Sequence, residues 1–141
     1  MTLDEGAFKE SFRAGMEALK TRHCPDAKVV AVDGNFAYID LGDGTLPAIY
    51  AERNARVFAR VPLDFPNAEP YGVVTAPYLH RADTAPIERH HSSHPHSKPI
   101  ETALGLTDIG FWSWDWQRMP RKTPEDLSHI YEWAWKRIRQ G

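Results

Sequence analysis

The segment RHHSSHPHS, residues 89–97, gathers four histidines and three serines within nine residues. Its residues repeat neither with a helical nor with a strand period, so the sequence predicts an irregular polar segment here. Three interpretations remain open at this stage: a metal site, a serine nucleophile with its base, and a mobile loop that becomes ordered only on binding a partner.

As a metal site, the segment offers imidazole nitrogens, which suit zinc and nickel. Zinc sites need three or four ligands that are held by further hydrogen bonds, and no cysteine lies nearby. The expectation is therefore that no cofactor is required, with zinc as the alternative. The candidate ligands are His90, His91, His94 and His96.

As a catalytic segment, it combines hydroxyls with potential bases. A serine can attack an acyl group if a histidine removes its proton, and histidine does so at neutral pH. The candidate catalytic residues are Ser93, Ser92 and Ser97, with His94 in the segment and His80 before it.

The composition narrows the kind of protein. The chain of 141 residues fits one domain, residues 1–141, and its net charge of −2 argues against a general nucleic-acid surface. A single cysteine excludes a disulfide framework, and no apolar run is long enough to span a membrane. The expected location is the cytoplasm, with no nucleic-acid or membrane partner.

The elements that must position these residues begin with an expected helix over 3–22, opened by a capping box of Thr2 and Glu5. Strands are expected at 28–32, 36–42, 55–61 and 71–76, with a turn at Asp33-Gly34-Asn35. Residues 77–110 show no confident element. A closing helix follows Thr123, with Pro124 at its first position and acidic residues in its first turn. This order predicts an α+β fold with a four-stranded antiparallel meander.

The stretch ARVFARVPLDFPNAEPYGVVTAPYLH, residues 55–80, carries a resemblance to a known family. A strand runs into a turn stiffened by Pro62, Pro66 and Pro70, with Phe65 inside it, and then into the next strand. This pattern, and the order of elements around it, resembles the ubiquitin-conjugating (UBC-like) enzymes. The resemblance implies an N-terminal helix, a four-stranded meander, a long irregular active-site segment, and a tryptophan before the closing helix.

The sequence departs from that family at the catalytic position. Family members carry a cysteine in the irregular segment, whereas Cys24, the only cysteine here, lies between the first helix and the first strand. The family's His-Pro-Asn motif is reduced to His80-Arg81-Ala82. The chain is most similar to cysteine-lacking bacterial members, which implies a ubiquitin-like protein and an activating (adenylating) enzyme as partners.

Two further features have a structural and a functional interpretation each. Trp112, Trp114 and Trp116 are expected to pack over the sheet and the closing helix, with a peptide-docking surface as the alternative. The basic residues near the C-terminus are expected to form a solvated face, with docking of an acidic partner as the alternative. These basic residues are Arg118, Arg121, Lys122, Lys136, Arg137 and Arg139.

The resemblance thus implies a UBC-like acyl carrier for a ubiquitin-like modifier, and the absence of a cysteine from the irregular segment implies a non-cysteine nucleophile. Two alternatives stay open: an inactive UBC-like scaffold that binds the modifier or its activating enzyme, and a histidine-rich metal-binding protein.

Overall fold

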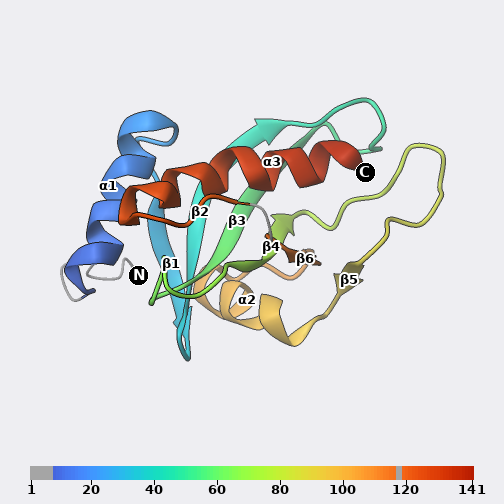
Figure 1. Cartoon of the computed structure of the whole chain (residues 1–141). Coiled ribbons are helices and arrows are strands. Elements are labelled where there is room, and N and C mark those ends of the chain that lie inside the picture. Colours follow the sequence, from blue (N-terminus) through green and yellow to red (C-terminus); the bar gives the residue numbers. More distant parts are fainter. Residues whose placement is uncertain (1–7, 117–118) are drawn as a thin grey trace.

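The computed structural model describes residues 8–116 and 119–141, with the backbone alone at 114 and 115 (Figure 1). The chain folds as an α+β domain, with a helix at each end of the described sequence and a six-stranded antiparallel sheet. The helices are α1 (Glu10–Arg22), α2 (Lys98–Leu104) and α3 (Ile130–Gln140), with 3₁₀ turns η2 (Pro95–Ser97) and η3 (Pro124–His129) before the last two. The strands are β1 (Lys28–Asp33), β2 (Phe36–Thr45), β3 (Asn54–Pro62), β4 (Tyr71–Ala76), β5 (His90–Ser92) and β6 (Gly110–Asp115).

The sheet confirms the predicted meander and extends it. Strands β1 to β4 pair in sequence order, and β6 then pairs with β4 while β5 pairs with β6. Both β5 and α2 lie inside the segment 77–110 that was expected to be irregular, so that expectation was wrong. The prediction of four strands is also incomplete, because residues 110–115 form a further strand, β6, and β5 pairs with the outer edge of β6.

Strand alternation gives the sheet two apolar faces. Val57, Ala59 and Val61 of β3 belong to the core that packs against α1 and α3, and α3 crosses that face (Figure 1). Phe58 points to the other face, where Ile100 of α2 is fully buried beside it. Because neighbouring residues of a strand point to opposite faces, the buried positions in the middle of the sheet alternate between these two cores.

The helix ends follow the predicted signals in part. Helix α1 begins at Glu10 rather than earlier, because Phe8 and Lys9 are not helical. Residues 3–7 and the Thr2–Glu5 capping box lie outside the described residues. At the other end the cap at Thr123 is confirmed, because its backbone N–H donates to the Asp126 carboxylate at 3.0 Å. It opens the 3₁₀ turn η3, however, and the α-helix α3 begins only at Ile130.

The proline-rich corner between β3 and β4 is a packed structure. Phe65 is 1% exposed and belongs to the core beneath α1 and α3. The Leu63 N–H donates to the carbonyl of Asn35 at 2.7 Å, and Arg121 Nη1 donates to the carbonyl of Pro66 at 2.9 Å. The corner is therefore held to the β1–β2 turn and to the segment before α3, as expected for an element that fixes the entry to β4.

The aromatic residues of β6 support the structural interpretation. Trp112 and Trp116 are fully buried in the core beside α3, and Trp112 Nε1 donates to Thr75 Oγ1 at 2.9 Å. The side chain of Trp114 lies outside the described residues. Trp112 thus joins β4 and β6 to the closing helix, and its ring also contacts His90.

Candidate functional site

Two loops meet beyond the end of β4. The N–H of Ala51, in the β2–β3 connection, donates to the carbonyl of His80 at 2.8 Å. The N–H of Ala82 returns a bond to the carbonyl of Ile49 at 2.7 Å, and Tyr50 and Arg81 form an isolated antiparallel bridge between these two bonds. The residues after β4 are therefore fixed in place by backbone pairing, although they lie outside the six-stranded sheet.

This pairing brings Glu52 against His80. One carboxylate oxygen, Oε2, lies 2.7 Å from Nδ1 of the His80 ring, and the other, Oε1, accepts the backbone N–H of His80 at 2.8 Å. An ionised carboxylate can only accept, so Nδ1 carries a proton, and in the neutral form of the ring Nε2 holds the lone pair. Among the described residues, none hydrogen-bonds to that Nε2, and the side chain of His80 is 62% exposed. His80 thus has the tautomer and the exposure of a proton acceptor.

The electrostatics of Glu52 agree with this arrangement. Partial burial by itself raises the pKa of Glu52, but the hydrogen bonds from the ring and the backbone of His80 outweigh it, and the net pKa is lowered. Glu52 is therefore ionised at neutral pH and can stabilise a positive charge on the His80 ring.

A small hollow lies beside His80. Its volume is about 250 Å³, and aromatic, aliphatic and polar side chains line it. Tyr78 contacts the His80 ring edge-on at 5.2 Å between centroids and stacks on His90 at 4.1 Å. The hollow is lined by residues 78–81, 84–87 and 90, so the segment after β4 encloses it almost alone.

His90 forms the inner wall of this hollow. Its ring lies between Tyr78 and Trp112, with the Trp112 centroid 4.4 Å away, and its Nε2 is buried with no hydrogen-bond partner among the described residues. Burial, followed by the charges of His91 and His80, lowers the pKa of His90 to about 4. A Cβ at Gly110 would lie 2.3 Å from Nε2, so glycine is required for this close approach. His90 is a neutral, packed imidazole.

Residues of helix α3 contact the segment that follows β4. Arg137 Nη2 donates to the carbonyl of Glu88 at 2.8 Å, and the guanidinium lies 5.0 Å from the centre of the Trp112 ring. Tyr50 donates its hydroxyl to the carbonyl of Ile138 at the end of α3. Arg137 is therefore not part of a solvated basic face, because it is 8% exposed and has an internal partner.

The remaining histidines of the segment lie on the opposite face of the sheet. His91 pairs with Phe111 across β5 and β6, and its Nε2 lies 3.0 Å from Ser113 Oγ. His94 stacks on Phe111 at 4.4 Å, and His96 lies 5.0 Å from His94. Burial is the first cause that lowers the pKa values of both His94 and His96, and Arg60 adds to it.

This division bears on the metal interpretation. His90 lies on the α3 side, whereas His91, His94 and His96 lie on the α2 side, so the four candidate ligands do not converge. His94 Nδ1 also accepts the N–H of His96 at 3.0 Å, which occupies that lone pair. Within residues 8–116 and 119–141, no three His, Cys, Asp or Glu side chains form a group that could hold a metal ion.

The candidate serines have different surroundings from those that a nucleophile needs. Ser97 is fully buried, and its hydroxyl donates to the carbonyl of His94 at 2.8 Å. Ser92 and Ser93 are exposed, and Ser93 has a φ of 54°. In the described part of the chain, neither forms a hydrogen bond to a histidine ring; the serine that does is Ser113. The structure thus brings His80 to a carboxylate but does not bring Ser93 to His94.

Cys24 lies apart from all of these residues. Its Sγ donates to the carbonyl of Leu41 at 3.5 Å, and burial, together with the charge of Asp40, raises its pKa to about 11. A thiol with such a pKa is protonated at neutral pH and is a poor nucleophile.

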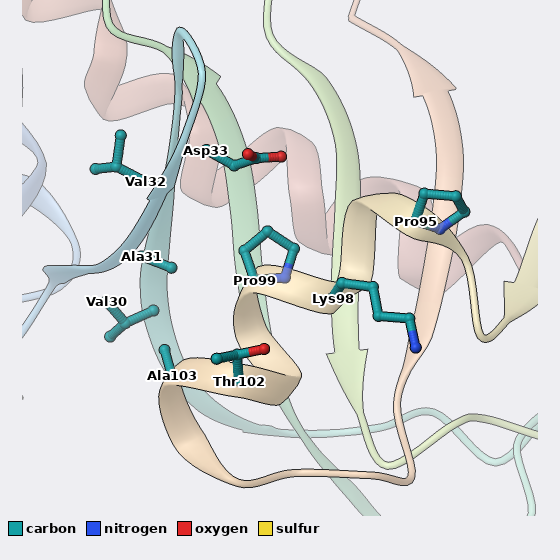
Figure 2. Close-up of a pocket in the computed structure, with 9 residues that line it drawn as sticks. All are labelled: Val30, Ala31, Val32, Asp33, Pro95, Lys98, Pro99, Thr102 and Ala103. Carbon is teal, nitrogen blue, oxygen red and sulfur yellow. The ribbon is translucent and has the colours of Figure 1, made fainter.

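A larger hollow lies elsewhere in the described structure. A groove of about 660 Å³ lies between β1 and α2, with Val30 and Val32 on one side and Pro99 and Ala103 on the other (Figure 2). Asp33 and Lys98 are its charged residues, and its lining includes no histidine, serine or cysteine. Its size exceeds that of the His80 hollow, but it lacks groups that could move a proton near neutral pH.

Sequence reasoning identified His80 but not its partner. Glu52 lies in a connection with no motif, 28 residues before His80, and no local pattern relates the two. Comparisons with models of protein families, with curated proteins and with solved structures find no match for this chain. No helix among the described residues is long and apolar enough to cross a membrane.

Proposed function

We propose that this chain is a UBC-like protein that acts in a ubiquitin-like modification system, with a ubiquitin-like protein and its activating enzyme as partners. The order of helix, four-stranded meander and closing helix supports the proposal, as does the buried Phe65 in the proline-rich corner. The extra strands β5 and β6 and the helix α2 are additions to the arrangement that the resemblance implies.

The observation that carries the proposal is the place of His80. The resemblance puts the active site in the segment after the fourth strand, and His80 is the fourth residue after β4. There it is bound by both oxygens of Glu52 and opens onto a hollow of about 250 Å³. A histidine base in this position suits a protein that binds the activated C-terminus of a modifier and promotes its transfer.

An inactive scaffold remains the second candidate, and one observation favours it. Neither of the exposed loop serines, Ser92 and Ser93, is paired with a base in the described structure, and Ser97 is inaccessible. A protein without a paired nucleophile could bind the modifier and present it to another enzyme. The metal-binding alternative has no comparable support, because the histidines are divided between the two faces of the sheet.

The test first asks whether genes beside the gene for this chain encode a ubiquitin-like protein and an adenylating enzyme, and then uses those two proteins. The purified chain is mixed with both and with ATP, and binding is followed by size-exclusion chromatography while conjugation is followed by gel shift. Binding together with ATP-dependent conjugation supports an active role, and binding alone supports the scaffold. Absence of both, or of such neighbouring genes, would remove the proposal.

A further inference from the structure

We infer that His80 and Glu52 form a general-base pair, and that this chain uses it to pass an acyl group from a thioester on the activating enzyme to an amine without carrying the group itself. The inference rests on the proposed function for the identity of the acyl donor. The base pair itself rests on the geometry alone, and the two can be tested separately.

The first step is the fixed tautomer of His80. Because Glu52 Oε2 accepts from Nδ1 at 2.7 Å, the free Nε2 is the basic nitrogen of a side chain that is 62% exposed. The second bond, from the backbone N–H of His80 to Oε1 at 2.8 Å, prevents the carboxylate from rotating away. Holding both groups in this way lowers the entropic cost of reaching the reactive geometry.

The second step is the charge that Glu52 supplies. When Nε2 accepts a proton, the imidazolium forms next to an ionised carboxylate, which stabilises it. Arg81, which also lines the hollow, is paired with Asp83 by bonds of 3.0 and 2.9 Å. Glu52 therefore gives the site a negative charge that attracts a cationic amine before it is deprotonated.

The third step is the hollow. Tyr78, Ile87 and His90 give it an apolar and aromatic wall, which shields one side of His80 from water. His90 is neutral, because its pKa is lowered to about 4, so it does not repel an incoming ammonium group. The space suits the end of an extended amine side chain, such as that of lysine.

The reaction balances without a nucleophile from this chain. The ammonium group first loses one proton to bulk water. The lone pair of the neutral amine nitrogen then attacks the thioester carbonyl carbon, and His80 Nε2 takes the second proton that this nitrogen loses. The carbon–sulfur bond then breaks, and the leaving thiolate of the activating enzyme takes that proton back from the His80 imidazolium. The products are an amide and a free thiol. His80 is the catalytic residue and Glu52 is a positioning residue.

The chain provides a matched control. His129 also lies beside a carboxylate, with its Nε2 3.4 Å from Asp126 Oδ1, but this pair is on η3, and His129 does not line the His80 hollow. Substituting His129 removes one histidine that also lies beside a carboxylate. The variant therefore shows how much an imidazole outside the hollow contributes to the aminolysis rate.

The experiment measures aminolysis of a small activated thioester, S-phenyl thioacetate, by n-butylamine in the presence of the full chain. We expect His80→Gln to reduce the protein-dependent rate by roughly 10²-fold, a typical contribution of a general base. His129→Gln should leave it unchanged. If wild-type protein and His80→Gln gave the same aminolysis rate, and circular dichroism showed that both are folded, the inference would be overturned.

The role of Glu52 needs a readout beyond loss of rate. Glu52→Gln keeps an acceptor for the backbone N–H but removes the charge that stabilises the imidazolium. The rate, divided by the concentration of unprotonated n-butylamine, should therefore fall about tenfold, and the rising limb of its pH profile should move to lower pH. If Glu52 only supported the local structure, its substitution would lower the rate without moving the rising limb of the pH profile. An unmoved limb would therefore contradict the assignment of Glu52 as the group that stabilises the imidazolium.

The complete system separates this inference from the proposed function. If the modifier is bound and conjugated equally by wild type and His80→Gln, the base pair is wrong while the proposed function stands. If His80 is needed for aminolysis of the small thioester but the modifier neither binds nor reacts, the proposed function is wrong. A modifier adduct on this chain during turnover, seen by intact mass, would overturn transfer without carrying.

Discussion

His90 and His91 are adjacent in β5, yet their rings lie on opposite faces of the sheet. His90 stacks between Tyr78 and Trp112, whereas His91 contacts Ser113 and belongs to the group of rings around Phe111. In the sequence the two histidines look like one chelating pair. The strand separates them, because successive side chains of a strand point to opposite sides.

The buried position of His90 predicts a loss of stability in acid. The pKa of His90 is about 4 in the folded chain and near the ordinary 6.5 when unfolded, so the unfolded state binds more protons between these values. The stabilisation is complete above pH 6.5 and is lost as the pH falls toward 4. From pH 7.5 to pH 5, His90 should reduce the free energy of unfolding by about 2 kcal/mol.

Urea denaturation at the two pH values checks this prediction. His90→Phe keeps an aromatic ring between Tyr78 and Trp112 but cannot be protonated, so it should remove most of that difference. His91→Gln, on the exposed side of the same strand, is the matched control and should keep most of the difference, because burial outweighs the charge of His91 in lowering the pKa of His90. An unchanged pH dependence in His90→Phe would show that other groups govern acid stability.

The proline-rich corner is predicted to contribute strongly to stability. Because the ring of Phe65 is buried in the main core, Phe65→Ala should cost about 3–5 kcal/mol in chemical denaturation. Leu63→Ala, at a partly buried position two residues earlier, should cost less. A loss below about 1 kcal/mol for Phe65→Ala would mean that the corner does not depend on this ring, and would weaken the UBC-like proposal.

The parts of the fold that the sequence predicted have local signals. The strand 71–76 and the alternation of Val57, Ala59 and Val61 were predicted at or near their observed bounds, because period two and flanking turn residues are visible within a short window. The cap at Thr123 was likewise predicted from its neighbours. For the same reason Phe65, between two prolines, could be assigned to the core.

The parts that were missed depend on contacts between distant residues. Strand β5 has three residues, and it is a strand only because β6 pairs with it. Helix α2 carries end signals, with Pro99 in its first turn and Gly105 in the left-handed conformation after it, but its seven residues show little periodicity. The pairing of Glu52 with His80 is of the same kind, since only the meeting of two loops brings them together.

Arg137 is predicted to hold the candidate segment in place. Arg137→Met removes the bond to the Glu88 carbonyl and the charge above Trp112, so amides of residues 84–92 should exchange with deuterium about tenfold faster, as expected for loss of a charge-assisted hydrogen bond. Hydrogen exchange followed by mass spectrometry measures this. Arg139→Met, an exposed residue on the same helix, is the control and should leave the segment unchanged.

Cys24 is predicted to be chemically inert in the folded protein. Its pKa of about 11 and its burial keep it as a protonated thiol, so a disulfide reagent at pH 7.5 should label it slowly, and rapidly only in denaturant. Cys24→Ala should leave conjugation unchanged. Rapid labelling of the folded chain, or loss of conjugation in a folded Cys24→Ala variant, would contradict this expectation and return the cysteine to consideration as a carrier.

The last prediction concerns the loop serines, because it separates a carrier from a protein that transfers without carrying. If Ser93 carried the modifier, the reaction mixture would contain an oxyester that resists reductant and is cleaved by hydroxylamine or mild alkali. We expect no such adduct, since Ser93 has no histidine partner among the described residues and Ser97 is buried. Ser93→Gly, which suits the φ of 54°, should therefore retain full conjugation and be slightly more stable. An alkali-sensitive adduct mapped to residues 92–97 by peptide mass, and lost in Ser93→Gly, would instead establish the serine carrier.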